Sequence, residues 1–125
     1  MIVLDTSVLI DALSGPRRSA PAMRDALAAG ERMLLPALVL YEWLRGPRLP
    51  EQLAAQDGLL PAEAALPFGA AEAAAATDLY RAVTEPRGRE VDIAIAAHAI
   101  VRDVPVWTLN VADFEDLPGV ELYAA

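Results

Sequence analysis

The chain has 125 residues, which is long enough for one domain with a hydrophobic core and too short for two. Hydrophobic residues make up 55% of the chain and charged residues 22%, which excludes a disordered or fibrous protein. The absence of cysteine excludes disulfides, zinc–thiolate sites and thiol nucleophiles. The net charge of −8 argues against a nucleic-acid partner, unless several of the acids bind metal ions.

The start of the chain has no basic region ahead of an apolar stretch. No run approaches the roughly eighteen apolar residues that a membrane-spanning helix needs. We therefore expect a soluble, cytoplasmic protein that forms a single domain over residues 1–125.

Short apolar runs separated by turn residues divide the chain into alternating strands and helices. Pro36 can begin a helix, because its missing N–H would have no intrahelical partner there. The helix that follows is apolar on nearly all sides, so we expect it to be largely buried. Strands that alternate with helices imply a parallel α/β sheet. The predicted strands span 1–4, 33–35, 106–109 and 120–123, the helices 6–13, 18–29, 37–45, 50–56, 70–84 and 90–102, an irregular link 59–68, and a turn or short helix 110–114.

Three acids, Asp5, Glu42 and Asp92, lie in segments whose other residues predict burial. A lone buried carboxylate is costly, so each acid needs a partner. Most arginines fall in turns or on polar helix faces, and only Arg45, one turn after Glu42, can pair locally. Asp5 directly follows a strand, and the carboxyl ends of parallel strands form the crevice where ligands bind. We therefore expect the three acids to converge on a shared counter-ion.

A cluster of carboxylates without histidine or cysteine is a hard-oxygen site, which favours Mg²⁺ or Mn²⁺ over zinc. Ions held in this way can activate a water and stabilise the leaving oxygen of an in-line displacement. The sequence therefore indicates phosphodiester hydrolysis.

Four short motifs follow one another along the chain: VLDTS at 3–7, YE at 41–42, VDIAIA at 91–96 and TLNVADF at 108–114. In order, spacing and total length they resemble the PIN-domain nucleases, in particular the VapC-like toxins of bacterial toxin–antitoxin pairs, over essentially the whole chain. The resemblance implies an α/β fold. It would be a three-layer sandwich with a short, mostly parallel sheet of about four or five strands flanked by helices.

The same resemblance implies a catalytic quartet, Asp5, Glu42, Asp92 and Asp113, that holds one or two Mg²⁺ or Mn²⁺ ions. Asn110 lies nearer the strand end than Asp113 and is the alternative fourth member. Residues implied to orient the acids or bind water are Thr6 or Ser7, Thr108 and Asn110.

The resemblance also implies partners, namely an RNA substrate, a cognate VapB-like antitoxin and a second copy of the chain in a homodimer. Arg45 lies beside Glu42, and Arg87 and Arg89 lie just ahead of Asp92. These three arginines are candidates for contacting the RNA backbone. Bound Mg²⁺ would offset the negative charge of the site acids.

Each acid also has a simpler interpretation. Asp5 can cap the helix that follows it. Glu42 can pair with Arg45, and Asp92 can provide a favourable charge at a helix N-terminus, worth about 0.3–1 kcal/mol. These interpretations explain neither the apolar surroundings of the acids nor the order of the motifs.

Other conspicuous residues receive structural interpretations. His98 lies six residues after Asp92 and off its helix face, so we interpret it as structural. Trp43 and Trp107 occur in apolar segments and are predicted to belong to the core. Asp116 is interpreted as a solvated surface charge.

The leading hypothesis is a metal-dependent endoribonuclease that acts as a toxin. The alternatives are a PIN ribonuclease without a toxin role, a catalytically silent PIN interaction module, and a phosphatase with Asp5 as covalent nucleophile. The last is disfavoured, because such enzymes place a second aspartate where this chain has Ser7 and use a lysine, which this chain lacks.

Overall fold

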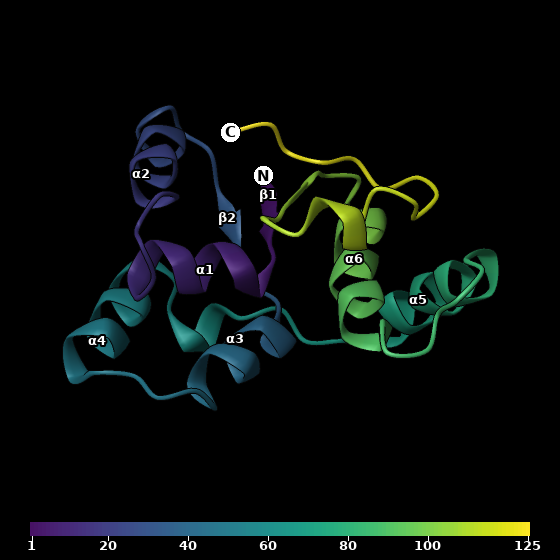
Figure 1. Cartoon of the computed structure of the whole chain (residues 1–125), viewed down its shortest axis with the longest axis horizontal. Helices are drawn as coiled ribbons and strands as arrows, with labels where there is room; N and C mark the ends of the chain where they lie inside the picture. Colours follow the sequence, from purple (N-terminus) through teal and green to yellow (C-terminus); the bar gives the residue numbers. More distant parts are fainter.

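The computed structural model describes residues 1–125 and has six α-helices around a small β-sheet (Figure 1). Every predicted helix is present, with boundaries that shift by a few residues. Two 3₁₀ helices lie within the predicted irregular link and the predicted turn. The elements are β1 (Ile2–Leu4), α1 (Thr6–Leu13), α2 (Ala20–Ala28), β2 (Met33–Leu34), α3 (Ala37–Leu44), α4 (Pro50–Leu59), η1 (Ala62–Ala64), α5 (Ala70–Ala82), α6 (Glu90–Arg102), β3 (Val106–Trp107) and η2 (Val111–Asp113).

The sheet is parallel throughout and has the strand order β2-β1-β3, which confirms the predicted α/β class. Val3, in the central strand, pairs with Leu34 on one side and Val106 on the other. Because all three strands run in the same direction, their carboxyl ends meet at one edge.

The sheet is smaller than the four or five strands expected. Residues 120–123 do not form a strand, because Leu122 makes only a single bridge with Val106. Val106 N–H donates to the Glu121 carbonyl (2.9 Å), and Tyr123 N–H donates to the Val106 carbonyl (2.8 Å). The chain reaches β3 through a turn at Gly119, whose φ is 79°, and stays beside the strand too briefly to extend the sheet.

Helices cover both faces of the sheet, which gives the predicted three layers. In Figure 1, α1, α2 and α4 lie on one side of the strands, and α6 with α5 beyond it lies on the other. The packing of α6 against β1 and of α5 against α6 joins these layers. The fully buried side chains that fill the interior include Ile2, Leu4, Leu9, Ile93, Ile95 and Phe114.

The prediction that the helix over 37–45 is largely buried was wrong. In α3 only Val39 and Trp43 are buried, whereas Tyr41 is 57% exposed and Leu44 is 50% exposed. The helix packs on α1 and α6 along one side only. Its apolar outer side therefore faces solvent, although its sequence resembles that of a core helix.

Both tryptophans belong to the core as predicted, since Trp43 and Trp107 are buried. His98 is completely buried in α6 beside Phe68, which agrees with a structural role. No helix in the structure combines the length and apolar character that crossing a membrane would require.

Candidate functional site

The candidate site lies at the carboxyl edge of the sheet, where each strand delivers one part of it. Asp5 follows β1 and Thr108 follows β3, while the chain that leaves β2 enters α3, which carries Glu42. Parallel strands create this arrangement, because residues just after their ends are neighbours in space however far apart they are in the sequence.

The Asp5 carboxylate is fixed by two hydroxyl groups. Ser7 Oγ donates to Asp5 Oδ2 at 2.7 Å, and Thr108 Oγ1 donates to the same oxygen at 2.8 Å. Asp5 occupies the N-cap position of α1 in extended conformation, yet its side chain makes no capping hydrogen bond. The helix-cap interpretation of this side chain was therefore wrong. Asp5 is only 3% exposed, and its second oxygen, Oδ1, accepts no hydrogen bond from the protein.

The two hydroxyl groups are themselves oriented by the backbone. Leu109 N–H donates to Ser7 Oγ (3.0 Å), and Asn110 N–H donates to Thr108 Oγ1 (2.9 Å). Since each hydroxyl accepts from the backbone, its own proton is directed to Asp5. The segment after β3 thus orients the acid that follows β1.

Glu42 is the second acid and projects from α3. Thr6 Oγ1 donates to Glu42 Oε1 at 2.6 Å, and Arg45 Nη2 lies 3.3 Å from Oε2. The local Glu42–Arg45 pair expected from the spacing is therefore present. Two adjacent residues of α1 thus bind different acids: Thr6 donates a hydrogen bond to Glu42, and Ser7 donates one to Asp5.

Asp92 is the third acid, in the first turn of α6, and its side chain is half-buried. Burial raises its pKa to about 6, and the negative charges of Asp5, Asp113 and Glu42 add to this increase. The pKa would not respond to these three carboxylates unless they lay near Asp92. Each of these three carboxylates therefore lies within electrostatic reach of Asp92.

Asp113 ends the 3₁₀ helix η2 and is exposed, as is Asn110, the alternative fourth member. The charge of Asp113 raises the pKa of Asp92, which places its carboxylate within electrostatic reach of the site. Asn110 takes part through its backbone, by donating to Thr108 Oγ1.

The arginines near the site differ in their surroundings. Arg87 is exposed and makes no ion pair or side-chain hydrogen bond. Arg89 instead donates to both carboxylate oxygens of Asp116 (2.8 and 2.6 Å) and to the Asp113 carbonyl (2.9 Å). The partnership with Asp116 was missed, because nothing in the spacing of residues 27 positions apart indicates it.

The chemistry of the site suits a hard divalent cation, since its donors are carboxylate and hydroxyl oxygens only. The repulsion that raises the Asp92 pKa is the condition that a cation would relieve. The side chains do not form a closed cage, however, because no three acidic or histidine residues stand close enough together to hold an ion. Binding would require the carboxylates to approach one another.

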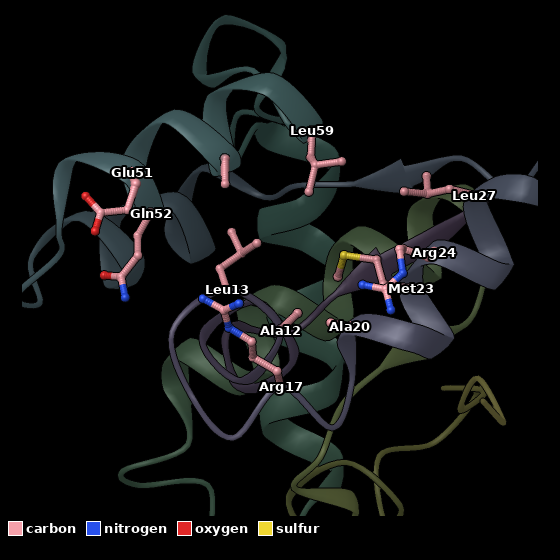
Figure 2. A pocket seen from close by; sticks show the side chains of 11 residues that line it. Ala12, Leu13, Arg17, Ala20, Met23, Arg24, Leu27, Glu51, Gln52 and Leu59 are labelled. Atoms are coloured by element: carbon pink, nitrogen blue, oxygen red, sulfur yellow. The ribbon is translucent and has the colours of Figure 1, made fainter.

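A hollow of about 410 Å³ between α1, α2 and α4 is a different kind of surface (Figure 2). Its lining is mostly apolar and includes Leu13, Met23 and Leu59, with Arg17 and Arg24 among the polar residues. None of the four acids contributes to it. The hollow is therefore separate from the carboxylate site.

A short parallel sheet lies between helical layers, and Asp5 at its carboxyl edge, together with Glu42 and Asp113, lies within electrostatic reach of Asp92. These features define an α/β domain with an acidic site. The chain matches the PIN domain family over residues 2–119. It belongs to that family, whose members are generally nucleases.

Solved structures share this fold. A chain of the DNA-bound VapBC complex from Salmonella typhimurium superposes with a TM-score of 0.76 at 23% identity, over 98% of this chain and 96% of that one. A chain of VapBC2 from Rickettsia felis, bound to a promoter DNA fragment, superposes with a TM-score of 0.74 at 20% identity, over 98% of each chain. A chain of FitAcB from Neisseria gonorrhoeae superposes with a TM-score of 0.74 at 20% identity, over 99% of this chain and 97% of that one. No curated protein matches the chain in sequence.

Proposed function

We propose that the protein is a Mg²⁺- or Mn²⁺-dependent endoribonuclease, and that it acts as a VapC-like toxin. The observation that carries the proposal is the raised pKa of Asp92, which is caused first by burial and then by the negative charges of Asp5, Asp113 and Glu42. Repulsion of this kind is costly in the free protein and becomes useful when a cation binds. Membership of the PIN family supports the nuclease class.

The residues that would hold the ion are Asp5, Glu42, Asp92 and Asp113. A divalent ion bound there supplies Lewis-acid chemistry, which activates water at neutral pH and neutralises phosphate charge. Asp113 is preferred to Asn110 as the fourth member, because a carboxylate binds a hard divalent cation more strongly than an amide and the charge of Asp113 reaches Asp92.

The protein's own side chains prepare the site before any ligand binds. Ser7 and Thr108 donate hydrogen bonds to one oxygen of Asp5 and fix the orientation of its carboxylate. Thr6 fixes Glu42 in the same way. Asp92 holds a proton on its carboxyl group for part of the time near pH 6, and releasing this proton prepares it to bind a cation.

For the substrate, we propose RNA with its backbone approaching from the side of the exposed Arg87 and of Arg45, whose side chain is 56% exposed. Arg45 pairs with Glu42, and Arg87 precedes by three residues the first residue of α6, the helix that carries Asp92. Phosphate oxygens are suited to such exposed guanidinium groups.

The direct test is cleavage of an RNA panel with Mg²⁺ or Mn²⁺, with and without EDTA. Wild type should cleave only with metal, and Asp5→Asn should reduce cleavage to background because an amide is a poor cation ligand. Asp78→Asn, an equal change of charge at an exposed position of α5, should cleave normally. Cleavage that survives EDTA or Asp5→Asn would contradict the mechanism, and a wild type inactive with every RNA and metal would favour a silent PIN module.

As partners, we propose a VapB-like antitoxin and a second copy of the chain. Support for the antitoxin comes from the similar structures, which are described as VapBC2, VapBC and FitAcB. A small reading frame beside this gene that encodes a DNA-binding protein, whose co-expression abolishes cleavage, would meet the expectation for the antitoxin. A mass of two chains in light scattering would meet that for the homodimer.

A further inference from the structure

The segment that carries Asp113 is not part of the sheet, so something else must hold it beside Asp92. The segment is anchored from beneath by Phe114 and Leu117, which are buried. These apolar anchors fix its depth, but Asp113 itself lies on the exposed side of η2.

Arg89 provides a polar connection across this gap. It is the N-cap residue of α6, three positions before Asp92. Its guanidinium group donates two hydrogen bonds to the Asp116 carboxylate, from Nη1 to Oδ2 (2.8 Å) and from Nη2 to Oδ1 (2.6 Å). A third, from Nη2, reaches the carbonyl of Asp113 (2.9 Å). One planar group therefore joins the start of α6 to both ends of the short segment 113–116.

The geometry of this connection distinguishes it from an ordinary surface pair. The Arg89 side chain is only 21% exposed, and its two terminal nitrogens bind the carboxylate as a fork. Two parallel hydrogen bonds fix an orientation, which a single ion contact does not. The bond to the Asp113 carbonyl then sets the backbone of the residue that carries the fourth acid.

We propose that Arg89 and Asp116 are positioning residues that hold Asp113 at a fixed place relative to Asp92, and so set the affinity of the site for its divalent cation. This rests on the proposed function, in which the acids bind such a cation. It replaces RNA contact as the role of Arg89, because three of its five N–H donors are already engaged within the protein.

The test compares Mn²⁺ affinities by isothermal titration calorimetry for wild type, Asp116→Asn and Glu115→Gln. Glu115 is the exposed neighbour of Asp116, and its side chain makes no ion pair or hydrogen bond, so its variant controls for the lost charge. We expect Asp116→Asn to weaken Mn²⁺ binding by about 10-fold or more, as is usual for residues that orient metal ligands, and Glu115→Gln to leave it within error. Circular dichroism in EDTA should show all three proteins folded.

A second pair of measurements separates positioning from RNA binding. Arg89→Lys keeps the charge but loses the fork, so positioning predicts weaker Mn²⁺ binding and unchanged RNA binding in EDTA. Arg89→Gln also removes the charge. If Arg89 contacts RNA, this variant should bind RNA more weakly and Mn²⁺ with normal affinity, and that result would overturn the proposal. So would an Asp116→Asn protein that binds Mn²⁺ as tightly as Glu115→Gln. If wild type itself binds no Mn²⁺, the proposed function fails as well.

Discussion

Thr108 Oγ1 donates a 2.8 Å hydrogen bond to Oδ2 of Asp5, which lies 103 positions earlier in the sequence. The two residues follow β3 and β1, whose ends lie side by side at the carboxyl edge of the sheet. Ser7 Oγ binds the same oxygen. The position of the Asp5 carboxylate therefore depends on the last strand of the sheet as well as on its own segment.

Thr108→Val removes this hydroxyl while keeping the shape of the side chain. Asp5 loses one of its two donors, and Asn110 N–H loses its acceptor. We expect Mn²⁺ affinity to fall about 10- to 100-fold. The free energy of unfolding should fall by about 1 kcal/mol for the lost buried hydrogen bond. Calorimetry and urea denaturation measure the two effects.

Thr77→Val is the matched control for this substitution. Thr77 is exposed on α5, and its hydroxyl donates only to the Ala73 carbonyl. Mn²⁺ binding by this variant should equal that of wild type. If Thr108→Val bound Mn²⁺ equally well, the hydroxyl would have no part in orienting Asp5.

Arg87→Gln tests the proposed approach of RNA. Arg87 is exposed and has no ion-pair partner, so its charge is available to phosphate. We expect weaker RNA binding for all sequences, and a slope of log K against log salt that is less negative by about 1. Fluorescence anisotropy in EDTA measures this without cleavage. Arg81→Gln, at an exposed position of α5, should leave the slope unchanged; equal slopes for both variants and wild type would remove Arg87 from the RNA path.

Much of the candidate site was predictable, because acids are conspicuous in apolar segments. Asp5 stands out after Ile2–Leu4, and Glu42 and Asp92 stand out in mostly apolar helices. Such local contrast identifies which residues need a partner. The strands were equally visible, since each is a short apolar run, and their alternation with helices indicated a parallel sheet.

What remained hidden depends on distant neighbours. The exposed side of α3 has the composition of a buried one, and only the absence of a covering element exposes Tyr41 and Leu44. The partnership of Arg89 with Asp116 joins two turns that have no periodic pattern. Asp5 has the position and backbone of a helix cap, yet hydroxyl donors, one of them from after β3, bind its side chain instead.

The raised pKa of Asp92 predicts a pH effect on stability in metal-free protein. Its pKa is about 6 in the folded state against 3.8 ordinarily, so the folded state binds more protons between these values. Stability should therefore fall as the pH rises from about 4 to 6 and then level off. The full shift corresponds to about 3 kcal/mol, but Asp92 is half-buried and screened by solvent, so we expect about 1 kcal/mol.

Asp92→Asn and Mn²⁺ provide the checks on this effect. The variant cannot ionise at this position and should lack the decrease in melting temperature over that pH range. Saturating Mn²⁺ should raise the melting temperature of wild type most above pH 6, where Asp92 has lost its proton. If the melting temperature of Asp92→Asn fell by the same amount over this pH range, the decrease would be caused by groups other than Asp92.

His98 should change the stability in the opposite direction, so that its contribution falls as the pH falls. It is completely buried, its Nε2 has no hydrogen-bond partner, and its Nδ1 lies 3.4 Å from Nη1 of Arg102. Burial and the Arg102 charge lower the pKa of His98, and Glu72 opposes them only in part. As the pH falls below about 6.5, His98 binds a proton in the unfolded chain but stays neutral to lower pH in the folded protein. The stability that neutral His98 provides is therefore present above this pH and is lost on acidification.

This loss is best measured in the Asp92→Asn protein, where the opposing effect of Asp92 is absent. Between pH 7 and pH 5, urea denaturation should show a falling free energy of unfolding in Asp92→Asn and a smaller decrease in the double variant with His98→Gln, which cannot ionise at position 98. The double variant will be less stable overall, since glutamine fills a completely buried site poorly, but the prediction concerns its pH dependence alone. Equal slopes with and without His98 would show that its protonation is not linked to unfolding.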